Sequence, residues 1–217
     1  MSVGGDAFCA GKGGGRAADG GHGAERFATH ALAGSNQLWL ARHAKPLIAP
    51  GICYGTLDVE AHAELTQMAA QSLAKALPTD ITVITSPLRR CMQLAECLQA
   101  LRPDLTYQTD DRLREMDFGT WEGVPWADIP KEAVDAWTDD FANHRFGGKE
   151  SANEVLARVA SAWDSLQANM STLWIAHSGV AQAVSLLQQG IRRVERAQDW
   201  PAPQLGFGEW LTFSRRA

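Results

Sequence analysis

Two apolar segments of the chain each end in a histidine. The first segment, Leu38–Ala41, is followed directly by Arg42 and His43. The second, Thr172–Ala176, is followed by His177. Short apolar runs are typical of buried strands, and open α/β sheets bind ligands at the carboxyl ends of their strands. We therefore expect the two histidines to face one pocket. For the first segment alone, a strand ending at a solvated Arg and a loop His is an alternative.

A third predicted strand, Ile81–Thr85, leads toward Arg90. Ser86 and Pro87 between them are typical of an N-cap and a first helical residue, which places Arg90 at the start of a helix. A helix N-terminus presents free N–H groups, and the guanidinium forks of Arg42 and Arg90 match phosphate oxygens. This group of cations and imidazoles would neutralise a phosphoryl group without a metal ion.

The elements that must position these side chains alternate between strands and helices. Strands are expected at about 38–41, 81–85, 105–109, 172–176 and 209–213, and helices at about 64–77, from 86, at 126–129, 131–143, from 151, and 178–189. This alternation predicts an α/β fold, a three-layer α-β-α sandwich whose mostly parallel sheet has helices on both faces. The first helix is expected to bury Leu65 and Met68, and the helix from 151 is expected to bury Trp163, Leu166 and Met170.

The first 36 residues differ from the rest in composition. Ten of the first 34 are glycine, and such a segment buries too little apolar surface to offset its ordering entropy. We predict a disordered N-terminal segment at 1–36, with one domain at 37–217. The segment lacks the continuous apolar region of a secretory signal.

Bulk composition limits the partners. The formal net charge of −5 gives no reason to expect nucleic acid or an anionic membrane, and no apolar run approaches the roughly 18 residues of a spanning helix. Four cysteines, at 9, 53, 91 and 97, have neither zinc-site nor disulfide spacing. They predict free thiols in a reducing compartment and a cytoplasmic location. The oligomeric state stays open.

Four segments, in this order, resemble the histidine phosphatase superfamily, also called phosphoglycerate mutase-like. They are Arg42-His43-Ala44, Ser86–Arg90, Glu115 within Leu113–Gly123, and His177-Ser178-Gly179. The resemblance covers residues 37 to about 213. The chain departs from the family pattern at Ala44 and Ser178, where glycine is usual, and a backbone conformation that favours glycine would cost about 1 kcal/mol at Ala44.

The resemblance implies a role for five residues and no metal or other cofactor. His43 would be the nucleophile that forms a phosphohistidine. Arg42, Arg90 and His177 would bind the phosphoryl oxygens, and His177 would also stabilise the transferring charge. Glu115 would protonate the leaving oxygen and then activate water, which requires partial burial of its carboxyl group. The alternative for Glu115 is a solvated acid. Glu122 is expected to be structural.

The segment Gly51–Val59 is similar to the Cys-Tyr-Gly-x-x-Asp-Val signature of alpha-ribazole phosphatases of cobalamin synthesis. It implies alpha-ribazole 5'-phosphate as substrate, with Tyr54, Gly55 and Thr56 contacting it. A Glu-Ser pair after Gly147-Gly148 also resembles that group, although Lys149 interrupts the match.

Other activities of the superfamily stay open. A broad-specificity phosphatase of sugar or glycerate phosphates is the main alternative. A phosphoglycerate mutase is less favoured because residues 123–148 are too short for the insertion of the mutases. A catalytically silent phospho-ligand binding module is less favoured because all five site residues are present.

Overall fold

A single sheet organises the molecule. The computed structural model describes residues 37–168 and 170–214, so the prediction of disorder at 1–36 lies outside the described residues. Five strands are arranged in the order β3-β2-β4-β1-β5. Their bounds are β1 Gln37–Arg42, β2 Thr82–Thr85, β3 Tyr107–Thr109, β4 Thr172–Ala176 and β5 Trp210–Ser214. Only the pairing of β5 with β1 is antiparallel in this described sheet, which confirms the predicted mostly parallel α/β fold.

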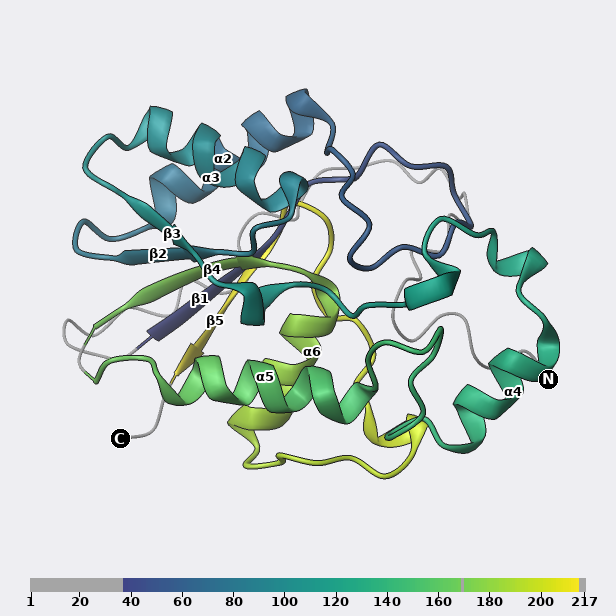
Figure 1. Cartoon of the computed structure of the whole chain (residues 1–217). Coiled ribbons are helices and arrows are strands. Elements are labelled where there is room, and N and C mark those ends of the chain that lie inside the picture. The colour runs from purple at the N-terminus through teal and green to yellow at the C-terminus, as the bar shows by residue number, and fades with distance from the viewer. Residues whose placement is uncertain (1–36, 169, 215–217) are drawn as a thin grey trace, which may run out of the picture.

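Helices cover both faces of the sheet (Figure 1). Helices α2 (Ala63–Ala76) and α3 (Arg89–Leu101) lie on one face, and α5 (Ala152–Asp164) and α6 (Ser178–Gln188) lie on the other. Helix α4 (Lys131–Asp139) lies to one side of this sandwich. Short 3-10 turns occur at Asp111–Leu113, Gly119–Trp121, Trp126–Asp128 and Ala197–Asp199. The predicted three-layer arrangement is therefore confirmed.

The alternation of side chains along β1 divides the core into two. Leu38 and Leu40 join the core beneath α5 and α6, whereas Trp39 and Ala41 join the core beneath α2 and α3. A side-chain period of two is expected for a strand, and here each face meets a helical layer. The central strand β4 is buried along its whole length, as a strand covered on both faces must be.

Two predicted apolar rows are wrong in part. Leu65 and Met68 are 41% and 64% exposed, because α2 instead turns Thr66, Ala69, Ala70 and Leu73 toward the core. Small side chains on that face allow close approach to the sheet. Met170 is also exposed, at 44%, since α5 ends at Asp164 and cannot extend its buried row that far.

The sheet brings the two histidine segments side by side. In the parallel pairing of β1 with β4, Arg42 lies opposite Ala176. His43 and His177 are the next residues, so they leave adjacent strands at the same edge. The backbone N–H of His43 still donates to the carbonyl of Ala176 at 3.2 Å, which extends the ladder to the site itself.

Candidate active site

The His43 imidazole is held in one tautomer. Its Nδ1 lies 2.7 Å from the carbonyl oxygen of Ala44, and its Nε2 accepts the Nε–H of Arg90 at 3.2 Å. A carbonyl only accepts and a guanidinium only donates, so these partners assign the proton to Nδ1 and the lone pair to Nε2. Burial, then the cations Arg90 and Arg42, hold the pKa of His43 well below its usual range. The ring is therefore kept neutral.

Arg90 is fully buried and fixed by the preceding loop. Its Nη1 and Nη2 donate to the carbonyls of Leu57 and Gly55, at 2.9 and 2.6 Å, and its guanidinium lies 5.6 Å from the ring centroid of Tyr54. A Cβ on Gly55 would lie 1.8 Å from the carbonyl oxygen of Met116, so only glycine fits there. Tyr54 and Gly55 thus contact Arg90, the arginine predicted to bind phosphate.

The predicted cap of the Arg90 helix is wrong. Helix α3 begins at Arg89, with Leu88 at the N-cap position. Ser86 lies too early to cap it, and its Oγ is instead 2.9 Å from Nε2 of His177. Arg89, the neighbour of Arg90, is exposed and pairs with acidic side chains on the surface.

Glu122 fixes the loop whose carbonyl groups accept hydrogen bonds from Arg90. Its carboxylate accepts backbone N–H groups from Gly55, Thr56 and Leu57 at 2.9, 2.9 and 3.0 Å, and one from Phe118 at 3.0 Å. These bonds join two segments that lie about 65 residues apart. They give Glu122 the structural role that the sequence predicts.

Arg42 lies at the end of β1, between a carbonyl and an aromatic ring. Its Nη1 donates to the carbonyl of Leu205 at 2.8 Å, and its Cζ lies 3.9 Å from the ring centroid of Phe207. The ring of Phe207, 37% exposed, also lies 5.6 Å from that of His43. The sequence analysis missed Leu205 and Phe207, because their loop carries no motif and reaches the site only through the fold.

His177 faces His43, with their ring centroids 5.1 Å apart. It is fully buried as the N-cap residue of α6. Burial, then Arg90 and His43, hold the pKa of His177 well below its usual range. Sγ of Cys91 lies 3.5 Å from its Nε2, and burial raises the pKa of this thiol to about 12, so Cys91 stays protonated.

Glu115 completes the cluster as its buried acid. The side chain is 7% exposed, and its two oxygens accept the N–H groups of Gly179 and Met116, each at 3.2 Å. Burial raises the pKa of Glu115, against the lowering effect of the Gly179 bond and the nearby Arg90. The partial burial that an acid in this position requires is therefore present.

Arg158 anchors the segment that carries Glu115. Its guanidinium donates to the carbonyls of Arg112, Arg114 and Glu115 at 2.8, 2.7 and 3.2 Å. It also pairs with Glu150, with Nε 2.6 Å from Oε1. Arg158 projects from α5, so this later helix fixes the backbone of Glu115. No motif in the sequence indicates this contact.

Comparison with known proteins gives this arrangement a family. Residues 38–201 match the family model described as "Histidine phosphatase superfamily (branch 1)". The chain belongs to the histidine phosphatase superfamily. With the phosphatase relatives described below, this match shows that the chain is a phosphatase of the superfamily. The five predicted site residues lie within the matched range.

Two curated relatives in this superfamily have phosphatase names. The chain is 30% identical to "Putative phosphoserine phosphatase 2" of Hydrogenobacter thermophilus, over 71% of this chain and 79% of the relative. It is 31% identical to glucosyl-3-phosphoglycerate phosphatase of Mycobacterium tuberculosis, over 67% of this chain and 69% of the relative. The solved structure of a mycobacterial glucosyl-3-phosphoglycerate phosphatase superimposes with a TM-score of 0.65 at 26% identity, covering 82% of this chain and 89% of that one.

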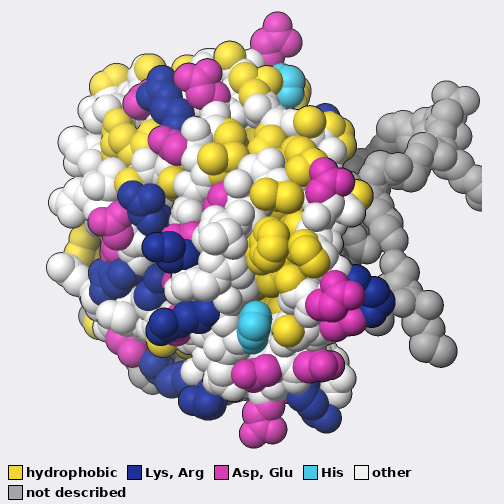
Figure 2. Space-filling view, turned by 45° about the vertical axis from the view of Figure 1, so that its right-hand side comes forward, with side chains coloured by type: hydrophobic (Ala, Val, Ile, Leu, Met, Phe, Trp, Pro, Cys, Tyr) yellow, Lys and Arg dark blue, Asp and Glu magenta, His cyan; other side chains and the backbone are white. Residues whose placement is uncertain are grey.

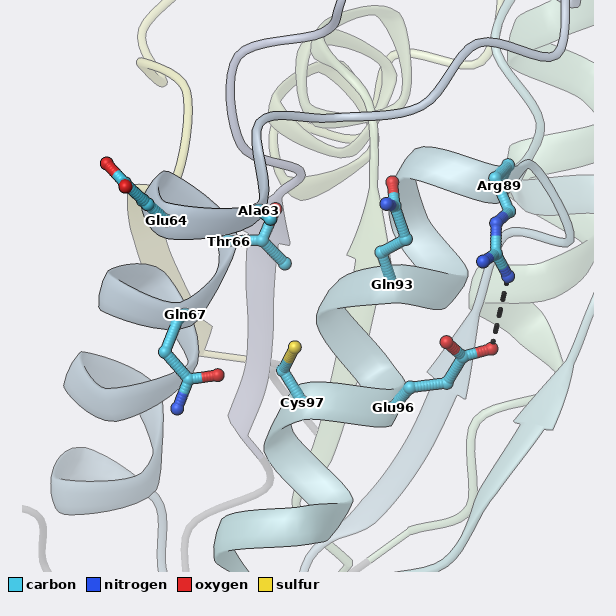
Figure 3. A pocket seen from close by; sticks show the side chains of 8 residues that line it. All are labelled: Ala63, Glu64, Thr66, Gln67, Arg89, Gln93, Glu96 and Cys97. Carbon is cyan, nitrogen blue, oxygen red and sulfur yellow. Dashed lines mark ion pairs between the residues drawn. The ribbon is translucent and has the colours of Figure 1, made fainter.

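A groove between α2 and α3 is separate from the histidine phosphatase site. It has a volume of about 590 Å³, and Figure 3 shows Thr66, Gln93 and Cys97 on its walls, with the Arg89–Glu96 ion pair at one end. None of the five predicted site residues lines it. The groove is therefore not part of the phosphate site.

In the part of the chain that the structure describes, no group of three or more His, Cys, Asp or Glu side chains is arranged to hold a metal ion. No helix of that part of the chain is long and apolar enough to cross a membrane.

Proposed function

We propose that this chain is a phosphomonoesterase that works through a phosphohistidine at His43. The observation that carries the proposal is the Nε2 lone pair of a neutral, buried imidazole, which has two arginines nearby. An unprotonated imidazole nitrogen is the form that attacks phosphorus. The domain boundaries 37–217 belong to this proposal.

The reaction has two displacement steps. First, Nε2 of His43 bonds to phosphorus, the ester P–O bond breaks, and Glu115 gives its proton to the leaving alcohol oxygen. Second, the Glu115 carboxylate takes a proton from water, the oxygen attacks phosphorus, and the P–N bond breaks. Inorganic phosphate leaves, and both side chains return to their starting protonation states. The raised pKa of Glu115 supports its role as the acid of the first step.

Three side chains would stabilise charge on the phosphoryl group. Arg90 donates to His43, Arg42 is a second cation near its ring, and the ring centroid of His177 lies 5.1 Å from that of His43. Donors held in place before the reaction stabilise the equatorial oxygens of the transition state without reorganising. Burial of Arg90 and His177 strengthens these interactions, since little water screens them.

The substrate is a small phosphate ester, and two kinds are supported by different observations. The segment Gly51–Val59 supports alpha-ribazole 5'-phosphate and a place in cobalamin synthesis. However, two residues of that segment make contacts within the protein that would be the same whichever ester binds. The carbonyl of Gly55 accepts from Arg90, and Asp58 accepts the N–H of Arg89 at 2.6 Å. The relatives named above support a small phosphorylated metabolite such as phosphoserine or a phosphoglycerate ester.

The cellular setting is part of the same proposal. Cys53, Cys91 and Cys97 form no disulfide with one another among the described residues, which suits a reducing compartment. We place the enzyme in the cytoplasm, with a small phosphorylated substrate as its partner.

A phosphate-release assay tests the proposed activity. Wild type should hydrolyse p-nitrophenyl phosphate, and His43→Ala should release no phosphate above the uncatalysed rate, while the exposed His62→Ala should match wild type. Quenching with radiolabelled substrate should leave acid-labile, base-stable label on His43. Activity should survive a chelator. Equal activity of wild type and His43→Ala would exclude the proposal.

A further inference from the structure

A second pocket adjoins the acid of the proposed reaction. It has a volume of about 370 Å³ and is lined by Glu115 on one side and Thr56 on another. Thr56 follows Gly55, whose carbonyl holds Arg90. Because Glu115 would protonate the leaving oxygen, the rest of the alcohol must extend from a point beside its carboxyl group. This pocket is thus in the position where the leaving alcohol would lie.

Most charges in the wall of this pocket are already neutralised by protein partners. Arg114 pairs with Asp111 at 2.7 Å, and Arg158 pairs with Glu150 at 2.6 Å. Glu154 pairs with Arg145. Asp117 is the exception: it forms no ion pair with a described residue and keeps its charge, and its Oδ1 accepts the N–H of Gly119 at 2.8 Å.

Lys149 differs from the paired groups. It lines the pocket and forms no ion pair with any residue that the structure describes. The net charge of the chain is −5, and the face in Figure 2 mixes cationic with acidic side chains. The chain therefore has no broadly positive face in this view that would attract anions. Selection of an anionic group would depend on the ammonium group of Lys149.

The turn that carries Lys149 is firmly held. Phe146 and Glu150 form an antiparallel bridge at its ends, and Gly147 and Gly148 have φ of 74° and 85°, which side-chain-bearing residues rarely adopt. The carbonyl of Gly147 accepts the N–H of Thr120 at 3.1 Å. A fixed turn keeps the lysine stem at the pocket wall.

We propose that this pocket is the subsite for the leaving alcohol and that Lys149 binds a carboxylate carried by that alcohol. Substrates would then be phosphate esters of hydroxy acids, including hydroxy amino acids. The inference rests on the proposed phosphatase function. It favours carboxylate-bearing esters over alpha-ribazole 5'-phosphate, whose alcohol has no carboxylate for Lys149 to bind.

Matched substrate pairs test the role of Lys149. 3-Phosphoglycerate and glycerol 3-phosphate differ in one carboxylate, as do phosphoserine and phosphoethanolamine. Wild type should prefer the carboxylate member of each pair. Lys149 is exposed, so Lys149→Gln should raise the KM for that member roughly two- to fivefold, as expected for an exposed charge pair. The effect of this substitution on KM should be much smaller for glycerol 3-phosphate and for p-nitrophenyl phosphate, because neither leaving group carries a carboxylate.

Two control variants isolate the local contact. Lys149→Arg should keep most of the preference, and Lys75→Gln, which removes the same charge from the far end of α2, should keep all of it. The role of Lys149 is overturned if the wild-type enzyme lacks the preference for carboxylate esters, or if the Lys149→Gln enzyme retains it. In either case, hydrolysis of p-nitrophenyl phosphate by wild type would still support the phosphatase function. Loss of p-nitrophenyl phosphate hydrolysis by wild type would instead reject the phosphatase function itself.

Discussion

The Nε–H of Arg90 donates to Nε2 of His43 across 3.2 Å. The guanidinium that would bind the phosphoryl group therefore also bonds to the lone pair that would attack it. An incoming phosphate must take over this N–H before the nitrogen can react. In the proposed reaction, Arg90 would thus fix the imidazole before substrate binds and hold the phosphoryl oxygens afterwards.

Replacing Arg90 with lysine should disable this arrangement while keeping the charge. One ammonium cannot reproduce the fork that contacts Leu57, Gly55 and His43 together. We expect kcat/KM for p-nitrophenyl phosphate to fall by about 10²–10³, the size of a lost transition-state donor. Arg89→Lys is the matched control, because Arg89 is exposed and should tolerate the change. Equal effects of the two substitutions would contradict the assignment of Arg90.

Glu115→Gln should discriminate between leaving groups. The amide has no proton to give, and general acids contribute about 10²–10⁴ in rate. An alkyl phosphate such as glycerol 3-phosphate needs a proton on its leaving oxygen, whereas p-nitrophenolate leaves without one. The variant should therefore lose far more kcat for phosphoryl-enzyme formation on the alkyl ester than on the aryl ester. Single-turnover release of each alcohol measures this step, and a uniform loss would argue against Glu115 as the acid.

The two perturbed groups should also set the pH dependence of the reaction. The pKa of His43 lies below its ordinary value of 6.5, so the nucleophile stays neutral at pH values below that point. The pKa of Glu115 lies above its ordinary value of 4.5, so the carboxyl group keeps its proton at pH values above 4.5 at which a free glutamate would be ionised. We expect kcat/KM for glycerol 3-phosphate, whose leaving oxygen needs the proton of Glu115, to be highest on the acid side of neutrality. Glu115→Gln should remove the wild-type decline on the alkaline side, measured with the same ester so that its own ionisation cancels.

Stability should respond to the buried histidines in the acid range. The folded state binds fewer protons than the unfolded state below pH 6.5, since the pKa of both His43 and His177 is lowered by burial and nearby cations. Their contribution to the free energy of unfolding is thus present above pH 6.5 and is lost as the pH falls. Urea unfolding at pH 7 and 5 should show a smaller loss for His43→Asn than for wild type. An equal loss would mean that His43 is not held neutral in the fold.

The local sequence contains enough information to place the two histidines, and not enough to place their supports. Short apolar runs specify β1 and β4, and parallel pairing then requires His43 and His177 to meet at one edge. Phe207 lies on an irregular loop, more than 160 residues from the strand it contacts. No periodicity or cap marks such a residue, because its contact depends on how the last strand returns beside β1.

The error at Ser86 has a related physical cause. Ser-Pro before an apolar helix satisfies the local rules for an N-cap, and α3 nevertheless begins three residues later. The hydroxyl of Ser86 is 2.9 Å from Nε2 of His177, which follows a different strand. A local preference was overridden by a long-range contact at the site.

Glu122→Gln should weaken the fold and the site together. Oε1 accepts N–H groups from Thr56 and Phe118, and Oε2 accepts those of Gly55 and Leu57. Either orientation of an amide therefore turns an NH₂ group toward two backbone donors, at a cost of about 2–4 kcal/mol. We expect Tm to fall by several degrees, since each kcal/mol shifts it by about 2–4 °C in a domain of this size.

The same substitution should lower activity below the melting transition. The Gly55–Leu57 loop would no longer be fixed, and its carbonyls orient the guanidinium of Arg90. We expect a loss of kcat/KM at 25 °C. Calorimetry should show that the variant is still folded at this temperature. Glu60→Gln, an exposed acid paired with Arg89, should change the free energy of unfolding by about 0.5 kcal/mol or less. A Glu122→Gln enzyme with wild-type activity and Tm would show that the Glu122 carboxylate does not position Arg90.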